Sequence, residues 1–580
     1  MADKANLTVF EAKLDTALAS LPSRSWSNSR VLRDASELYE VVASTSGSGA
    51  ADWIARGISI LASDLVIHRA GTFEVQADGD YFDQLAKDIE FASHYYMIRE
   101  YLYYSYNVND SMSWEFDGNH VEVRFKDESI PRQFFTVSND HILQSRYHFR
   151  DFNEADEILR LLKNEPEGVV TPNSEAADVL MRKEVDLKLE AYFSLIASSS
   201  QINLGDYTYA QFLSVYRLLL LKSLYHRYLA RAQGAVGVIY MPQVELTRAI
   251  EEELGVPVDA AERILKDLVY DAGAVGDRVD ATYFSLVRDG AESGDIMMRP
   301  HHFATSEGLV NLLRVIAQRR PKTFLDQVSN EIGSAFVRRV KANWESQGFQ
   351  CFSEISLAHI DQALPDIDLL VISREPTLGY VLYVCELKCP LPPRWAKDQL
   401  KVLNKDGVSK AFRQVEALKK FIRTEEGIKF IAKYVASGDH PHFDDFVVVI
   451  DHLIITSDNA GMFFAGEAVK VINFRTLERL LRRSDGDMAL IQYVLSSYPE
   501  WADDAMKKVM VEFQVGDLTV AYEAVADGLL LEFPQGEWQS SPKRQEMIDD
   551  FIAEGGRPSD VLGVRMPDAM VLDRRKLDAE

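Results

Sequence analysis

Four charged side chains lie within two apolar runs between Leu364 and Pro390, a stretch that reads LPDIDLLVISREPTLGYVLYVCELKCP. The first run carries Asp366 and Asp368, and the second carries Glu386 and Lys388. A carboxylate in a strand is costly to bury without a partner. We therefore expect these side chains to meet at one site.

The alternation of side chains along a strand separates the second run into two faces. Glu386 and Lys388 share one face, whereas Cys385, Leu387 and Cys389 share the other. The cysteines are therefore not candidates for a site built on Glu386. No further Cys or His pair lies nearby in the sequence, so we do not expect a zinc site.

A close pair of carboxylates is typical of a site for a hard divalent cation. If the two strands are neighbours, Asp368 and Glu386 meet over one face, where they repel and raise each other's pKa. Mg²⁺ or Mn²⁺ relieves this repulsion and prefers oxygen ligands. Such an ion favours phosphodiester hydrolysis, and Lys388 would orient the water or stabilise negative charge. The alternative is an exposed edge with solvated charges, which fits poorly with the apolar run Val381–Val384.

Helices and strands that could position this site follow one another from residue 323 to residue 483. We predict helices over 323–347, 399–424 and from 476, and strands over 349–357, 367–373, 380–389, 446–457 and 469–473. Gly348 ends the first helix in the position that glycine favours. This order is typical of a compact α/β domain with a mixed central sheet.

At these residues the sequence resembles the PD-(D/E)XK nuclease superfamily, which has the restriction-endonuclease-like fold. Pro365-Asp366 with Asp368, followed by Glu386-Leu387-Lys388, matches its motif. The resemblance implies an endonuclease, a hydrolase that cleaves nucleic-acid phosphodiester bonds with Mg²⁺ or Mn²⁺, with DNA favoured over RNA. It also implies that Asp368, Glu386 and the main-chain carbonyl of Leu387 bind the metal and that Lys388 is catalytic. Asp366 remains the alternative to Asp368.

The same resemblance implies two helper residues. Many members carry a glutamate on the first helix, for which Glu331 is the candidate and Glu345 and Glu354 are rivals. Many also carry a glutamine on the helix after the Glu-x-Lys strand, and Gln414 occupies that place. The Glu-Leu-Lys-x-Pro arrangement before this helix is similar to Shedu-type and Mrr-like defence nucleases. It implies a role in bacterial anti-phage (antiviral) defence or restriction.

The formal charge of −26 opposes binding of a polyanion. The basic residues are unevenly spread, however, and we expect a local basic rim to hold the phosphates. Lys401, Lys410 and Arg413 are the candidate nucleic-acid contacts beside the site, and Arg319 and Arg320 precede the first helix. Solvated helix faces are the alternative.

The whole chain is predicted to be α+β and multidomain. We expect a helical region with a small sheet over 1–150, a helical domain over 151–310, the nuclease domain over 323–483 and a C-terminal extension over 484–580. A helix-turn-helix with Gly255 in its turn predicts a winged-helix-like segment over about 243–304, and a structural helix pair is the alternative. The N-terminal region is expected to sense, dock or form homo-oligomers.

Cysteine content and hydropathy indicate the compartment. Three cysteines fit a reducing cytoplasm. We expect no signal peptide and no membrane partner, because the apolar run 213–221 is short and interrupted by charge. A catalytically inactive PD-(D/E)XK scaffold or nucleic-acid-binding module is the alternative to an enzyme.

Overall fold

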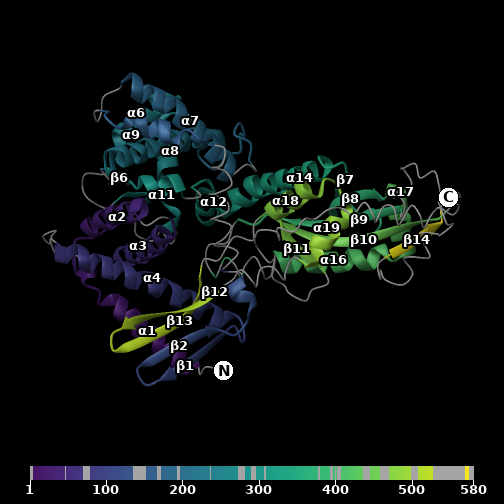
Figure 1. Ribbon diagram of the computed structural model, residues 1–580, viewed down its shortest axis with the longest axis horizontal. Helices are drawn as coiled ribbons and strands as arrows, with labels where there is room; N and C mark the ends of the chain where they lie inside the picture. The colour runs from purple at the N-terminus through teal and green to yellow at the C-terminus, as the bar shows by residue number, and fades with distance from the viewer. Residues whose placement is uncertain are drawn as a thin grey trace. The chain divides into compact units, whose positions relative to one another are not determined.

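The computed structural model describes most of the chain and has an α+β fold (Figure 1). The described residues are 4–45, 48–68, 79–132, 134, 152–165, 171–192, 196–234, 237–271, 281–288, 295–305, 308–375, 379–391, 396, 398, 400, 407–435, 445–457, 469–497, 507–526 and 569–573. Within these ranges, no helix is long and apolar enough to cross a membrane.

The chain forms two compact units. The first comprises Met1–Asp127, His141–Glu331 and Val509–Ala524, and the second comprises Glu128–Asp140, Ile332–Lys508 and Val525–Glu580. This division differs from the four predicted domains. The predicted extension over 484–580 is divided between the two units, because part of it completes a sheet in the first unit.

Four helices begin the first unit, each with one side buried by apolar residues at helical spacing. They are α1 (Lys4–Ala19), α2 (Asn28–Thr45), α3 (Ser48–His68) and α4 (Gly79–Asn107), with a 3-10 turn at Pro22–Ser25. In α4, Tyr96, Tyr101 and Tyr104 are buried. These tyrosines therefore belong to the core of the unit.

Strands far apart in sequence form the next sheet of this unit. Its order is β1-β2-β13-β12, with β1 at Met112–Asp117, β2 at His120–Phe125, β12 at Lys507–Val515 and β13 at Leu518–Ala526. Aromatic contacts bind the late strands to α4: His94 stacks on Phe513 with ring centroids 4.6 Å apart, and its Nδ1 lies 3.0 Å from the Tyr522 hydroxyl.

The rest of the first unit is helical around a small mixed sheet. Its helices are α6 (Ala155–Leu162), α7 (Pro172–Tyr192), α8 (Tyr209–Gln233), α9 (Gln243–Leu254), α10 (Val258–Leu268), α11 (Pro300–Thr305) and α12 (Gly308–Arg319), with a 3-10 turn at Ala281–Tyr283. Its strands are β3 (Ile239–Pro242), β4 (Val269–Asp271), β5 (Leu286–Arg288) and β6 (Asp295–Met298), in the order β3-β6-β5-β4.

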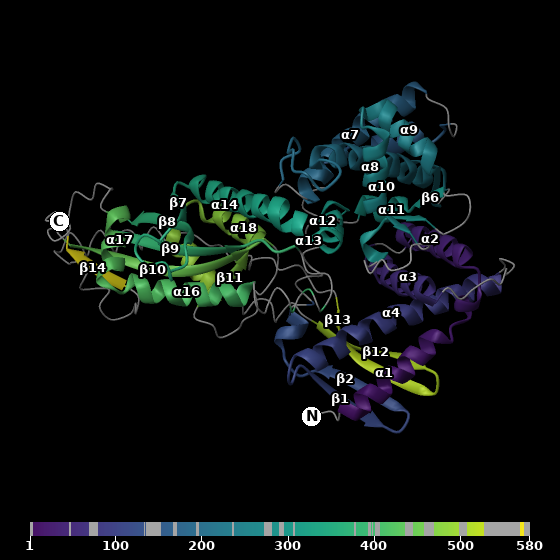
Figure 2. The ribbon, with the colours of Figure 1, turned by 180° about the vertical axis from the view of Figure 1, so that it is seen from behind.

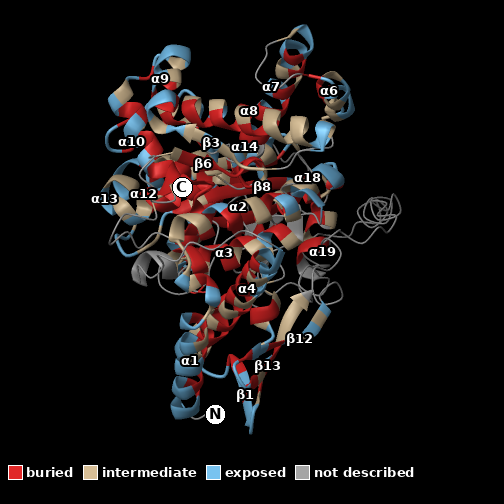
Figure 3. Ribbon diagram, turned by 90° about the vertical axis from the view of Figure 1, so that its left-hand side faces the viewer, coloured by how far each residue is buried: buried red, intermediate tan, exposed pale blue. Residues whose placement is uncertain are grey.

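The segment from β3 to β6 has the order of a winged helix. Gly255 links α9 to α10 with φ +67°, β5 and β6 are antiparallel, and β6 returns to pair with β3. The exposed residues of α10 are two acids and two bases, Asp259, Glu262, Arg263 and Lys266. This surface is unlike that of a DNA-recognition helix, which is usually basic. Figure 3 shows exposed residues along both α9 and α10. The structure thus favours the helix pair as a structural element.

A buried carboxylate joins α10 to the end of α12. Asp267 Oδ2 accepts hydrogen bonds from the Tyr207 hydroxyl at 2.6 Å and from Arg320 Nη2. Asp267 Oδ1 accepts a hydrogen bond from Arg319 Nη1 at 3.1 Å. The side chain of Asp267 is 3% exposed. Arg319 and Arg320 therefore hold the first unit together, which corrects their assignment to a basic rim.

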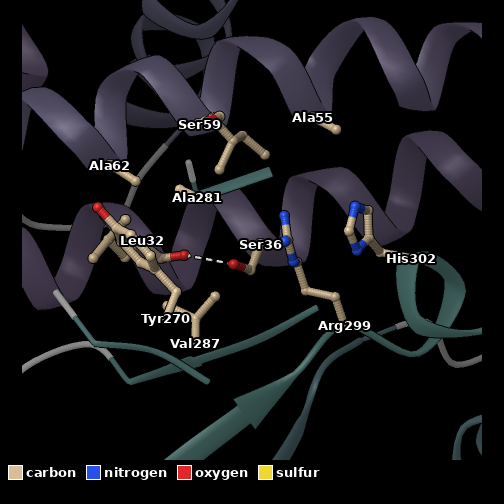
Figure 4. A pocket seen from close by; sticks show the side chains of 11 residues that line it. Leu32, Ser36, Ala55, Ser59, Ala62, Tyr270, Ala281, Val287, Arg299 and His302 are labelled. Atoms are coloured by element: carbon tan, nitrogen blue, oxygen red, sulfur yellow. Dashed lines mark hydrogen bonds between the residues drawn. The ribbon is translucent and has the colours of Figure 1, made fainter. Parts of the chain in front are cut away.

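A small cavity lies between α2, α3 and the winged-helix-like segment (Figure 4). It has room for about one water molecule, roughly 10 Å³. Arg299 and His302 line it, and both side chains already have partners: Arg299 donates to the Phe284 carbonyl at 2.5 Å and His302 lies 2.6 Å from the Ser285 hydroxyl. This cavity is a packing feature and is too small for a substrate.

The second unit is built on a mixed sheet in the order β11-β10-β9-β8-β7, with β14 paired to β10. Its strands are β7 (Gln350–Ile355), β8 (Ile367–Glu375), β9 (Gly379–Lys388), β10 (Asp445–Thr456), β11 (Lys470–Asn473) and β14 (Ala569–Asp573). Its helices are α14 (Asn330–Glu345), α16 (Val408–Ile422), α17 (Glu425–Val435), α18 (Phe474–Ser484) and α19 (Met488–Ser497). Two turns precede α14: the short helical turn α13 (Pro321–Thr323) and a π-helical turn at Phe324–Ser329. The boundary between the two units falls after Glu331.

Helices cover both faces of this sheet. Leu370, Leu382 and Val384 share one core with residues of α16 and α17. On the other face Tyr383 packs on Trp344 of α14 at 5.8 Å between ring centroids. Figures 1 and 2 show α14 and α18 on one side of the sheet and α16 on the other. Because both faces are covered, β9 is a continuous apolar run rather than an alternating one.

Replacing the buried carboxylate of the first unit tests its role. We expect Asp267→Ala to lower the free energy of unfolding by about 3–5 kcal/mol, because two guanidinium groups and a hydroxyl lose their shared partner. Urea unfolding followed by circular dichroism measures the change. Glu262→Ala, an exposed acid on the same helix, is the control and should change stability by less than about 0.5 kcal/mol. Equal effects of the two substitutions would contradict this assignment.

Candidate active site

Asp368 and Glu386 lie side by side on β8 and β9. The antiparallel register pairs Leu369 with Cys385, and continuing it by one residue sets Asp368 opposite Glu386. Asp368 Oδ2 accepts a hydrogen bond from the main-chain N–H of Leu387 at 2.7 Å. This bond fixes the Asp368 carboxylate beside β9, where it contacts the Glu386 side chain.

The environment of the two carboxylates favours a proton or a cation. Burial, and then the charge of Asp368, raise the pKa of Glu386 to about 7 although Lys388 opposes the shift. Burial also raises the pKa of Asp368, against the hydrogen bond from Leu387 and the charge of Lys388. The single positive charge of Lys388 therefore does not compensate the two adjacent carboxylates.

Lys388 is held between the carboxylate pair and α16. Its Nζ donates to Glu386 Oε1 at 2.5 Å and to Gln414 Oε1 at 3.1 Å. Ala411 and Val415 anchor α16 on the sheet and are fully buried. Gln414 lies between them in sequence, so the helix presents it at the level of Lys388. Because an ammonium group has three N–H donors, Lys388 retains one for a further acceptor.

One oxygen of this site is buried without a hydrogen-bond donor. The side chain of Glu386 is only 1% exposed. With both carboxylates ionised, its Oε2 has no hydrogen-bond partner within the described part of the chain. A buried charged oxygen without a partner is costly. A bound cation at this position would remove that cost.

The donor set fits Mg²⁺ or Mn²⁺. Within the described ranges no group of three or more His, Cys, Asp or Glu side chains could hold a metal. Asp368 and Glu386, which face each other across β8 and β9, offer two carboxylate ligands. The N–H and C=O of a strand residue point to the same neighbouring strand, so the Leu387 carbonyl is directed to the β8 side, as its N–H is. Mg²⁺ is commonly bound by one or two carboxylates and keeps several waters.

Other predicted residues take different positions. Asp366 is exposed and accepts a hydrogen bond from the main-chain N–H of Leu357 at 3.2 Å, so the geometry favours Asp368 as the ligand. Glu331 lies in the first turn of α14 and its role stays a prediction. Lys410 and Arg413 are exposed on α16. Lys401 lies outside the described residues.

The rivals of Glu331 and the cysteines lie elsewhere. Glu345 pairs with Lys341 at 3.7 Å, and Glu354 is exposed on β7. Cys351 and Cys385 are buried, and burial raises the pKa of both thiols. These thiols are therefore poor metal ligands at neutral pH.

Sequence reasoning missed the residue that fixes the end of β9. Ser457 donates its main-chain N–H to the Lys388 carbonyl at 3.0 Å and its hydroxyl to the Pro390 carbonyl at 3.4 Å. The pairing of β9 with β10 is parallel and distant in sequence. No local pattern around Ser457 predicts which residue it contacts.

Glu386→Gln tests the buried repulsion. The new amide can donate to Asp368, and its oxygen can still accept from Lys388, so we expect the variant to be more stable than the wild type by about 1–3 kcal/mol at pH 8 in EDTA. A raised carboxyl pKa makes the wild-type fold lose stability as the pH rises from 4.5 to about 7. The difference should therefore vanish near pH 4.5.

Urea unfolding at a series of pH values measures this difference. Glu416→Gln is the control, because that side chain is 57% exposed on α16 and should show no such pH dependence. A variant that is less stable than the wild type at pH 8 would refute the repulsion.

Comparison of the chain with protein-family models, with curated proteins and with solved structures gave no match. The chemistry of the site therefore rests on its own geometry.

Proposed function

We propose that this chain is a metal-dependent endonuclease with a PD-(D/E)XK site in its second unit. The observation that carries the proposal is the pair of buried Glu386 and half-buried Asp368, in contact with Lys388. The unpartnered oxygen of Glu386 and the raised pKa values of both carboxyl groups favour a bound cation. The mixed sheet with α14 on one face and α16 on the other is consistent with the restriction-endonuclease-like fold that the motif implies.

Each residue has a role in this proposal. A bound Mg²⁺ or Mn²⁺ would supply Lewis-acid stabilisation of the phosphate and lower the pKa of a bound water. Asp368, Glu386 and the Leu387 carbonyl would hold it. Lys388 donates its remaining N–H to a phosphate oxygen or to the attacking water. Gln414 fixes the ammonium group in that position.

Hydrolysis then exchanges one phosphorus–oxygen bond for another. The water oxygen bonds to phosphorus, the bond to the leaving sugar oxygen breaks, and the water proton passes to solvent or to the leaving oxygen. DNA is the favoured substrate. A role in bacterial anti-phage defence, with the first unit sensing, docking or oligomerising, follows from the motif resemblance and remains part of the proposal.

Cleavage assays on supercoiled and linear DNA, and on RNA, test the activity. We expect cleavage with Mg²⁺ or Mn²⁺ and none with EDTA. Asp368→Ala, Glu386→Gln and Lys388→Ala should each lower the rate at least about 100-fold, because each removes a group at the reacting phosphate. Gln414→Ala should cost less, about tenfold, because Gln414 acts through Lys388.

Asp366→Ala is the matched control for this series, since Asp366 is two residues from Asp368 but exposed. We expect it to retain most of the activity. Equal cleavage by the wild type and all variants would exclude this site as the source of the activity.

Metal binding can be tested without catalysis. A ligand that binds only the folded state stabilises it by about 2.7 kcal/mol at 100 times its Kd. We expect Mn²⁺ to raise the Tm of the wild type and of Asp366→Asn, but not that of Asp368→Asn or Glu386→Gln. An identical shift in all four proteins would mean that Mn²⁺ binds elsewhere, and a shift without cleavage would favour the inactive scaffold.

A further inference from the structure

The outer side of α18 is rich in arginine although the chain as a whole is strongly acidic. The helix reads FRTLERLLRRS, with four arginines and one glutamate. Its apolar side is buried through Phe474, Leu477, Leu480 and Leu481. The charged residues therefore gather on the outer side, where Arg482 and Arg483 are exposed and Arg475 and Arg479 are half-buried.

The register of the sheet sets the start of α18 at the same end as the candidate active site. Lys388 pairs with Thr456 on β10, and Thr456 pairs with Asn473 on β11. Neighbouring strands are about 4.8 Å apart, so Asn473 lies roughly 10 Å across the sheet from Lys388. Asn473 is also the N-cap of α18, where its side chain accepts a hydrogen bond from the N–H of Thr476 at 2.8 Å.

A neighbouring helix adds to this charge. The guanidinium of Arg339 on α14 lies 4.8 Å from the centre of the Phe474 ring, and Phe336 of α14 packs on the same ring at 5.9 Å between centroids. Figures 1 and 2 show α14 and α18 side by side over the sheet. We call Arg339, Arg475, Arg479, Arg482 and Arg483 the arginine strip.

The strip is long enough to contact more than one phosphate of a nucleic-acid backbone. Arg475, Arg479 and Arg482 stand at i, i+4 and i+7, so they follow one side of the helix over about 10 Å. The axis of B-form DNA advances about 3.4 Å for each phosphate of one strand, so a duplex lying along this helix exposes several phosphates to it. Guanidinium groups bind phosphate oxygens in bidentate geometry, which a single ammonium group cannot do. The strip has one acid among these arginines, Glu478, which contacts Arg482 at 2.9 Å.

We propose that the arginine strip binds the phosphate backbone of duplex DNA beside the candidate active site. The strip lies on the α14 and α18 face of the sheet, whereas Lys388 and Gln414 lie on the α16 face. A duplex at the end of the sheet would contact both. This inference rests on the proposed nuclease function. It identifies residues that bind phosphates of the substrate other than the phosphate that is hydrolysed.

Binding without cleavage tests the strip. Wild type and the double variant Arg475→Ala with Arg482→Ala are titrated against a labelled DNA duplex in EDTA at several salt concentrations. We expect the variant to bind at least tenfold more weakly at about 100 mM salt. The slope of log K against log salt concentration should be smaller in magnitude by about two, because two phosphate contacts are lost. Labelled single-stranded DNA and RNA of the same sequence are parallel arms.

The double variant Lys429→Ala with Lys433→Ala is the charge-matched control. Both lysines are exposed on α17, which packs on the α16 face, and the variant should bind duplex as the wild type does. Circular dichroism checks that each protein is folded. Duplex binding by the strip variant that equals that of the wild type overturns the proposal, as does a loss confined to RNA or single strands.

Cleavage separates this inference from the function on which it rests. If the wild type cleaves DNA and the strip variant binds duplex as the wild type does, the proposed role of the arginine strip is wrong and the proposed nuclease activity is retained. If the strip variant loses duplex binding while the wild type cleaves nothing with Mg²⁺ or Mn²⁺, the arginine strip binds DNA as proposed but the proposed catalysis is wrong.

Discussion

The chemistry of the second unit depends on the cost of placing two carboxylates, buried Glu386 and half-buried Asp368, next to each other. Asp368 and Glu386 lie opposite each other on adjacent central strands, and a single lysine does not balance them. The surroundings hold the pair in place nevertheless, through the N–H of Leu387, the contact with Lys388 and helices packed on both faces of the sheet. A fold that keeps such a repulsive pair gives up stability at that position. Such local costs are common at functional sites.

Charge is distributed so that an acidic chain can present basic surfaces. Residues 323–483 contain as many basic as acidic residues, so the excess negative charge lies elsewhere in the sequence. In the first unit the exposed part of α9 includes Glu251, Glu252 and Glu253, which agrees with a structural rather than a DNA-reading winged-helix-like segment. Local fields near a surface decay within about 10 Å at moderate salt. The arginines of α18 can therefore attract phosphates in spite of the total charge.

Not every basic residue belongs to such a surface. Arg319 and Arg320 stand in a basic, proline-containing segment of the sequence, yet both bind the buried Asp267. The arginines of α18 are indistinguishable from them by composition. Burial of the partner carboxylate separates the structural arginines from those that face solvent, and burial depends on long-range packing.

Local patterns in the sequence predicted most helices and strands of the second unit and the faces of β9, but not α17 or β14. Apolar runs and period-two alternation predicted β8 and β9 and separated Glu386 and Lys388 from the cysteines, because side-chain direction in a strand follows from local backbone geometry. The motif pointed to Asp368, Glu386, Lys388 and Gln414, and these side chains do lie together. Three features depended on tertiary structure: the preference for Asp368 over Asp366, the pairing of residues 507–526 with β2, and the start of α18 at the same end of the sheet as the site. Those outcomes depend on strand pairing between segments far apart in sequence, which local periodicity does not encode.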